Sequence, residues 1–300
     1  EDGYIYLSED WAFCQRARDA GFKMWVDPSI RVGHTGSYMF TLEDLLRPEK
    51  PLPQPISLQR SPNGNLSAKS QGMVATEIAT LPRHLADRFH FETPDELKGA
   101  IAQAGPMLAG FWKDHTGSEE AFYRRKDVGE AYILDLAGWH MKREVSELFM
   151  QQLTEKRGQG LRVLDYGAGI GTAALMLADG NTVDCVEPNR VMQDFALDRA
   201  KALERRLNFL SVPPAESKYD LSLCVDVLEH VAEPEKVAQT VRSALKPGGL
   251  LFTESDFTAS EEHPMHHDNE ADRIGSHFWE DLGMKRINKF WWRRLEEATV

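Results

Sequence analysis

The stretch LDYGAGIGT, which begins at Leu164, combines one acid with three glycines directly after an apolar run. Asp165 comes first, and Gly167, Gly169 and Gly171 follow at alternate positions. Glycine loses more backbone entropy on folding than any other residue. So many glycines in one loop therefore indicate that side chains must be absent there. Such a loop lets a ligand lie against the main chain, and a helix after it offers unpaired N–H groups. An acid before the glycines would repel a pyrophosphate and suits a ligand with positive charge.

The glycine spacing differs from that of a dinucleotide-binding loop. The pattern G-x-G-x-x-G would require glycine where Thr172 stands. Thr172 and the acid Asp165 therefore disfavour an NAD(P)-binding oxidoreductase, which stays an alternative, as does a non-catalytic Rossmann-like binding domain. S-adenosyl-L-methionine carries an ammonium, a carboxylate and a sulfonium but no phosphate, so it fits an acidic loop better.

The elements around the loop alternate between strand and helix patterns. Apolar runs predict strands at LRVLDYG, TVDCVE, LNFLSV, YDLSLCVD and LLFTES, and helices lie between them, including one from Pro234 to Leu245. This alternation predicts an α/β fold, a doubly wound and mostly parallel sheet with helices on both faces. Ligands bind at the carboxyl ends of such strands, which is where the glycine loop falls.

Four stretches resemble motifs of class I S-adenosylmethionine-dependent methyltransferases of type 11/12. They are VLDYGAGIGT, VDCVEPN, YDLSLCVDVLEHV and LKPGGLLFTES, in the family's order, within Leu161 to Ser255. The resemblance implies a Rossmann-like methyltransferase with a seven-stranded-type sheet and S-adenosyl-L-methionine as its cofactor. The family ends in an antiparallel strand pair, of which the sequence after Gly283 offers one clear strand.

The resemblance assigns cofactor-binding roles at the strand ends. Asp165 would hold the ammonium of the ligand through water, and Glu187 would accept hydrogen bonds from both ribose hydroxyls. Gly167 and Gly169 would admit the methionine and ribose parts, and Gly171 would let the next helix pack closely. The expected cofactor-binding residues are Asp165, Gly167, Ala168, Gly169, Gly171, Glu187, Pro188, Asp226 and Val227.

Simpler alternatives stay open for several of these residues. The glycines could form only a tight turn, and Glu187 could cap a helix. Asp226 would lie near the methionine part or the acceptor, or it could cap the turn that follows it. The adenine contact is expected near Val212 to Glu216.

Three histidines are candidate catalytic residues: His230 in LEHV, and His263 and His266 in EEHPMHHDNE. Holding donor and acceptor in line provides much of the rate of methyl transfer, and a base is needed only for a hydroxyl, thiol or protonated amine. One histidine would be that base or would orient the acceptor, although His230 could instead make a structural contact at a helix start. HPMHHD also suggests a metal site, and Glu229 with His230 resembles the Glu–His pair of quinone-type O-methyltransferases, some of which use a divalent ion.

The N-terminal stretch SEDWAFCQRARDAGFKMWVDPSIRVGHTGSY resembles a second family. It is similar to the C-terminal end of the catalytic domain of family-2-like GT-A glycosyltransferases. The resemblance implies that Asp10 is the base on an acceptor hydroxyl and that His34 is a ligand of a divalent metal. The nucleotide-binding half would lie upstream, so this fragment alone should not transfer sugar. Alternatively, Glu9 and Asp10 are only first-turn acids of a helix.

Composition divides the chain into four regions. They are a glycosyltransferase-like fragment (1–46), a proline-rich linker (47–72), broken helices that would form a lid (73–140) and the methyltransferase domain (141–300). The chain starts without Met, which predicts a piece of a longer protein. The two resemblances together imply a glycosyltransferase–methyltransferase fusion, and this linkage suggests a small-molecule or glycan acceptor. Aromatic residues of the lid region, more typical of a core than of a ligand cage, are Phe122, Tyr123, Tyr132 and Trp139.

Charge and composition exclude some partners. The net charge of −12 argues against nucleic acid, which needs clustered positive charge. No apolar run reaches the ~20 residues of a membrane span, and no signal peptide is visible. Three widely spaced cysteines suit a reducing compartment, so we expect a cytoplasmic protein; the oligomeric state is not indicated.

Overall fold

The structure is a computed structural model that describes residues 75–257, 264–267 and 278–296. The predicted fragment 1–46 and linker 47–72, with Asp10 and His34, lie outside the described residues, as does His263. Their assignments remain predictions from sequence.

One sheet of seven strands organises the described part of the chain, in the order β3-β2-β1-β4-β5-β7-β6. The first five strands of this order pair in parallel, and β7 pairs antiparallel with both β5 and β6. The strands are β1 (Arg162–Tyr166), β2 (Thr182–Val186), β3 (Asn208–Phe209), β4 (Tyr219–Val225), β5 (Leu245–Glu254), β6 (Met284–Arg286) and β7 (Trp291–Arg294).

The antiparallel pair that the resemblance implies is present. The sequence after Gly283 shows one clear strand pattern, yet the structure has two strands there. β6 contains only three residues, which is too short for an alternating pattern to be recognised. The predicted mixed sheet of seven strands is confirmed.

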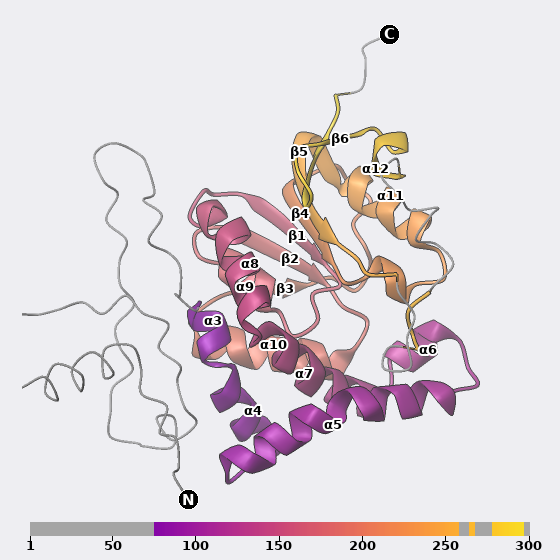
Figure 1. Cartoon of the computed structure of the whole chain (residues 1–300). Helices are drawn as coiled ribbons and strands as arrows, with labels where there is room; N and C mark the ends of the chain where they lie inside the picture. The colour runs from indigo at the N-terminus through magenta and orange to yellow at the C-terminus, as the bar shows by residue number, and fades with distance from the viewer. Residues whose placement is uncertain (1–74, 258–263, 268–277, 297–300) are drawn as a thin grey trace, which may run out of the picture. The chain divides into compact units, whose positions relative to one another are not determined.

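Helices cover both faces of the sheet, as the alternation predicts (Figure 1). Val163 of β1 packs in the core that includes α9, while Leu164 packs in the core beneath α11 and α12. Both side chains are fully buried, which explains why the strand lacks a polar face. The helices between β1 and β6 are α9 (Thr172–Leu177), α10 (Arg190–Ala202), η2 (Leu228–His230), α11 (Pro234–Ala244) and α12 (Phe278–Asp281).

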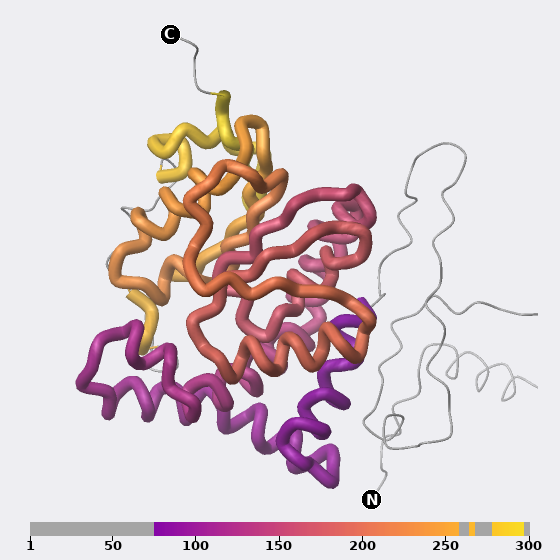
Figure 2. The backbone as a smooth tube through the Cα atoms, turned by 180° about the vertical axis from the view of Figure 1, so that it is seen from behind, coloured from indigo at the N-terminus to yellow at the C-terminus, as the bar shows by residue number. Residues whose placement is uncertain are grey.

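The helices before β1 pack against one end and one face of the sheet. Figures 1 and 2 show α5 and α6 along this end from opposite sides. Helix α5 begins after Thr93, whose hydroxyl accepts the Glu96 N–H at 3.3 Å in a capping box. These helices are α3 (Thr76–Ala79), α4 (Leu81–Phe89), α5 (Pro94–Lys113), α6 (Glu119–Tyr123), α7 (Lys126–His140), α8 (Arg143–Leu153) and η1 (Thr154–Lys156). Among the described helices, none is both long and apolar enough to cross a membrane.

Candidate active site

A cavity of about 990 Å³ opens at the carboxyl ends of β1, β2 and β4. Residues from α5, α6 and α7 line its other side. Its volume is at the upper end of the ~300–1,000 Å³ typical of ligand pockets. The cavity therefore has room for more than one small molecule.

The glycine loop forms the floor of this cavity. Gly167, Gly169 and Gly171 have φ values of 80°, 53° and 73°, a region that favours glycine. A Cβ on Gly167 would lie 2.2 Å from Cγ2 of Val227, so no side chain fits there. Gly171 does not line the cavity; a Cβ there would lie 2.9 Å from Cβ of Ala196 in α10, which agrees with its expected packing role.

Asp165 and Glu187 project from the ends of β1 and β2 into the loop region. Burial raises the pKa of Asp165 to about 7, and its Oδ2 atom has no hydrogen-bond partner among the described residues. Burial also raises the pKa of Glu187 to about 7, although Glu187 Oε2 accepts the Gly169 N–H at 2.9 Å. The Asn189 N–H donates to Glu187 Oε1 at 2.8 Å. The two buried carboxyl groups thus lie beside the glycine loop, and each can accept further hydrogen bonds.

The end of β4 adds two more acids. Asp226 has a φ of 51° and donates its N–H to the Glu254 carbonyl at 2.9 Å. Burial and then Glu254 raise the pKa of Asp226 to about 7, and burial and then Asp226 raise that of Glu229 to about 8. The Glu229 carboxylate accepts the Asp256 N–H at 3.0 Å, and its carbonyl accepts the His267 N–H at 2.9 Å. Glu229 therefore fixes the segment after β5 against η2.

His230 lies in an aromatic cluster on the side of the cavity that α6 and α7 line. Its Nδ1 is 3.1 Å from the hydroxyl of Tyr123, and its ring meets that of His266 edge-on at 4.6 Å between centroids. Tyr132 packs against the same imidazole at 6.4 Å. Tyr123, which the sequence favoured as a core residue, thus lines the cavity together with the histidine.

The structure gathers most of the sequence-predicted site residues around this one cavity. Its lining includes Asp165, Gly167, Ala168, Gly169, Glu187, Pro188, Asp226, Val227, His230 and His266. Of the stretch expected near the adenine, Pro213 lines the cavity and Val212 is 70% exposed, while Phe209, Leu210 and Ser211 just before it also line the cavity. β3 ends at Phe209, so the residues directly after it reach the rim first.

Two buried residues outside the predicted set of site residues also stabilise the site. Arg199 of α10 is fully buried and donates to the Ile170 carbonyl and to the Thr172 hydroxyl. The Thr172 hydroxyl also lies 3.0 Å from Nδ1 of His140. The position where a dinucleotide loop would need glycine therefore holds a side chain engaged in internal hydrogen bonds. The second residue is Asn189, which is 1% exposed.

Metal binding gains no support from the part of the chain that the structure describes. No group of three or more His, Cys, Asp or Glu side chains there is placed to hold an ion. Of the motif HPMHHD, His263 and Asp268 lie outside the described residues, so the motif as a whole remains a prediction.

The residues present fit S-adenosylmethionine. The unsatisfied Oδ2 of buried Asp165 suits an ammonium, since an ion pair would favour the charged carboxylate. The Glu187 carboxylate has acceptor capacity left for hydroxyls, and the positions of Gly167 and Gly169 leave the loop backbone accessible. The strand order and this acid–glycine floor define the class I S-adenosylmethionine-dependent methyltransferases with a Rossmann-like sheet.

Comparison with known families agrees with this class. Residues 138–293, just over half of the chain, match the family described as "Methyltransferase domain". The chain belongs to this family.

The similar curated proteins are methyltransferases. "Ubiquinone biosynthesis O-methyltransferase" of Methylobacterium sp. (strain 4-46) is 30% identical over 151 residues, 48% of this chain and 58% of that protein. "Thiol S-methyltransferase TMT1B" of Rattus norvegicus is 34% identical over 123 residues, 37% of this chain and 50% of that protein. The chain therefore spans only about half of the length of these relatives.

Among solved structures, Haemonchus contortus phosphoethanolamine N-methyltransferase 2 with S-adenosyl-L-methionine has a TM-score of 0.45 and 20% identity, over 56% of this chain and 45% of that one.

Proposed function

We propose that the protein transfers a methyl group from S-adenosyl-L-methionine to a hydroxyl of a small-molecule or saccharide acceptor. The observation that carries the proposal is the pair of buried carboxyl groups, Asp165 and Glu187, above the glycine floor of one cavity. S-adenosylmethionine, when bound, supplies a methyl group on a positively charged sulfur. Asp165 would hold its ammonium and Glu187 its ribose hydroxyls.

The acceptor would lie between this floor and the helices α6 and α7. In the transfer, the acceptor oxygen forms a bond to the methyl carbon while the carbon–sulfur bond breaks and its electron pair stays on sulfur. The acceptor's proton would pass to the imidazole of His230, which the cavity places beside His266. Two of the similar proteins are an O- and an S-methyltransferase by name, and a hydroxyl or thiol acceptor loses a proton when it is methylated.

Cofactor binding is tested by titration calorimetry of the chain with S-adenosylmethionine and, separately, with NAD. Heat with S-adenosylmethionine alone supports the proposal. Heat with NAD alone would favour the oxidoreductase alternative, and heat with neither would favour a domain without a cofactor. A panel of phenols and free saccharides, assayed for S-adenosylhomocysteine release, then separates the acceptor classes.

The saccharide option depends on the N-terminal resemblance. If residues 1–46 are the end of a glycosyltransferase domain, the methyltransferase would act on the sugar or glycosylated product that such a domain makes. Asp10 and His34 belong to that hypothesis, as does its divalent metal. Activity of a longer parent chain with a sugar nucleotide would test it.

A further inference from the structure

Asn189 lies at the corner between β2 and α10 and uses the full hydrogen-bonding capacity of its side chain. Its Oδ1 accepts the N–H groups of Val191 and Met192 at 3.0 and 3.4 Å, which caps α10. Its Nδ2 donates to the carbonyls of Tyr123 and Arg125 at 2.7 and 2.9 Å. An amide side chain offers two donors and two acceptor lone pairs, and all four are engaged here.

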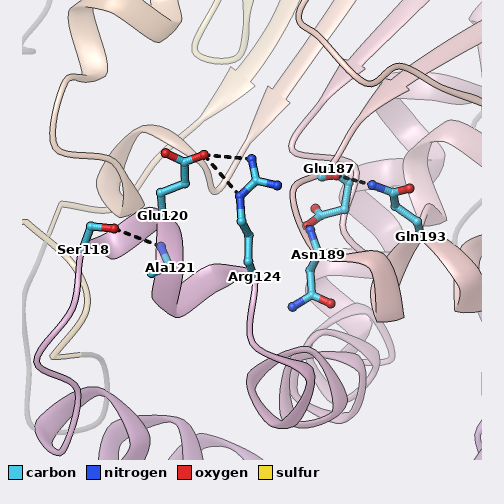
Figure 3. A network of polar contacts seen from close by, with 7 residues as sticks. All are labelled: Ser118, Glu120, Ala121, Arg124, Glu187, Asn189 and Gln193. Atoms are coloured by element: carbon cyan, nitrogen blue, oxygen red, sulfur yellow. Dashed lines mark hydrogen bonds and ion pairs between the residues drawn. The ribbon is translucent and has the colours of Figure 1, made fainter.

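The two carbonyls belong to the corner between α6 and α7. Tyr123 is the last residue of α6, and Arg125 is the N-cap of α7. The Tyr123 carbonyl lies at the C-terminal end of α6, where helix carbonyls have no partner within the helix. The Arg125 carbonyl accepts the Gly129 N–H at 3.0 Å in the first turn of α7 as well as the Asn189 amide, so Asn189 joins the end of one helix to the start of the next. Figure 3 shows Asn189 beside Glu187 and Gln193, and in the same view Glu120 of α6 and Arg124, which follows that helix. The corner also leaves no spare room, because a Cβ on Gly129 would lie 2.2 Å from Asn189 Oδ1.

The side chain of Tyr123 follows from the position of its backbone. Its ring packs edge-on against Phe122, which is fully buried, at 5.3 Å between centroids, and lies 6.4 Å from the ring of Trp112. Its hydroxyl lies 3.1 Å from Nδ1 of His230. The hydrogen bond at one imidazole nitrogen decides which nitrogen carries the proton.

We propose that Asn189 is a positioning residue for His230. Asn189 holds the α6–α7 corner in place by hydrogen bonds, and Tyr123 of that corner sets the ring orientation and the tautomer of His230. The inference rests on the proposed function in one respect, namely that His230 takes the acceptor's proton. Asn189 also donates its backbone N–H to Glu187, so one residue joins the cofactor side of the cavity to its acceptor side.

The test reads the tautomer of His230 by imidazole ¹⁵N spectroscopy of the full chain, with the signal assigned by its loss in His230→Gln. Tyr123→Phe removes the hydroxyl and should change the tautomer ratio of the neutral ring about tenfold. Asn189→Ser keeps an N-cap oxygen but removes both donors to the corner. Although residue 189 does not touch the imidazole, this variant should change the ratio in the same direction by a similar factor.

Asn181→Ser is the matched control. Asn181 also donates two side-chain hydrogen bonds, to the carbonyls of Lys156 and Leu177, and accepts one from Leu161, so its partners lie away from the α6–α7 corner. This variant should leave the His230 signal as in the wild type. If Asn189→Ser is unfolded, Asn189→Asp, which also caps α10, takes its place.

A wild-type His230 signal in the Asn189 variant, with a changed signal in Tyr123→Phe, would overturn the proposal. An equal change in Asn181→Ser would overturn it as well, since any lost hydrogen bond would then suffice. The measurement needs no acceptor and no methyl transfer. Failure of the positioning role is therefore distinguishable from failure of the proposed function, which the calorimetric titration decides.

Discussion

Asp165 and Glu187 differ in how the protein satisfies their carboxylates. Glu187 accepts one backbone N–H on each oxygen, whereas Oδ2 of Asp165 has no partner among the described residues. A buried acceptor without a partner destabilises the fold, while one with partners helps to hold it. The same loss of charge should therefore have different effects at the two positions.

Asp165→Asn should weaken S-adenosylmethionine binding about 10- to 100-fold, as expected for a lost charged hydrogen bond of ~1.5–3 kcal/mol. The unliganded protein should be no less stable, because the change removes an unsatisfied buried charge. Calorimetry gives the affinity and urea unfolding gives the stability. Asp220→Asn, at an ion pair with Lys246 away from the cavity, is the control and should leave the affinity unchanged.

Glu187→Gln should weaken both binding and folding. An amide nitrogen in place of one carboxylate oxygen would face an N–H of Gly169 or Asn189, so the unliganded protein should lose ~1–3 kcal/mol of stability. The same two measurements check this outcome. Equal stability of the Asp165 and Glu187 variants would contradict the difference drawn between the two carboxylates.

The sequence predicts residues whose role is local and misses those whose partners are distant. Asp165 and the glycines are recognisable because strand end, acid and loop are consecutive. Asn189 reads only as a residue before a helix, since its bonds to Tyr123 and Arg125 span more than 60 positions. Arg199 reads as one charge on an amphipathic helix, yet it is fully buried and donates to the Glu77 carbonyl 122 positions away.

Among the elements, helix α7 carries a glycine that the packing requires. A Cβ on Gly129 would meet Asn189 Oδ1, whereas a Cβ on Gly99 in α5 would meet nothing within 4 Å. Gly99→Ala should therefore stabilise the protein by ~0.5–1 kcal/mol through helix propensity. Gly129→Ala should destabilise it by ~1–3 kcal/mol through overpacking. Urea unfolding of both variants measures the two effects, and the same sign for both would show that the α7 contact is not tight.

Burial explains which elements the sequence reveals. Parallel strands such as β1 and β4 are buried on both faces and read as apolar runs bounded by polar residues. β6 has one buried residue, Met284, and two exposed ones, so it carries no distinctive pattern. The turn that separates α6 from α7 likewise receives two hydrogen bonds from Asn189, which lies in another part of the chain and which the sequence of the turn does not reveal.

For the whole molecule, buried titratable groups link stability to pH. Burial raises the pKa of Asp165, Glu187 and Asp226 to about 7 and that of Glu229 to about 8. The folded state therefore holds protons that the unfolded state has lost, and the stability they contribute is lost as pH rises from about 4 to about 8. Two histidines act in the opposite direction, because burial lowers the pKa values of His84 and His140 to about 4 and 3, so their contribution is lost as pH falls below about 6.5.

The four acids outnumber the two histidines, so the unliganded protein should melt at a lower temperature at about pH 8 than at about pH 6.

Bound S-adenosylmethionine should reverse part of this decrease in melting temperature. Its ammonium favours the charged form of Asp165 and its ribose hydroxyls favour that of Glu187, so binding releases protons and strengthens as pH rises. The increase in melting temperature at saturating ligand should consequently be larger at about pH 8 than at about pH 6. Scanning calorimetry with and without ligand measures both trends, and Asp165→Asn should reduce the pH dependence of the ligand effect. A ligand effect of equal size at both pH values would show that the buried acids do not meet the positive charge of the cofactor.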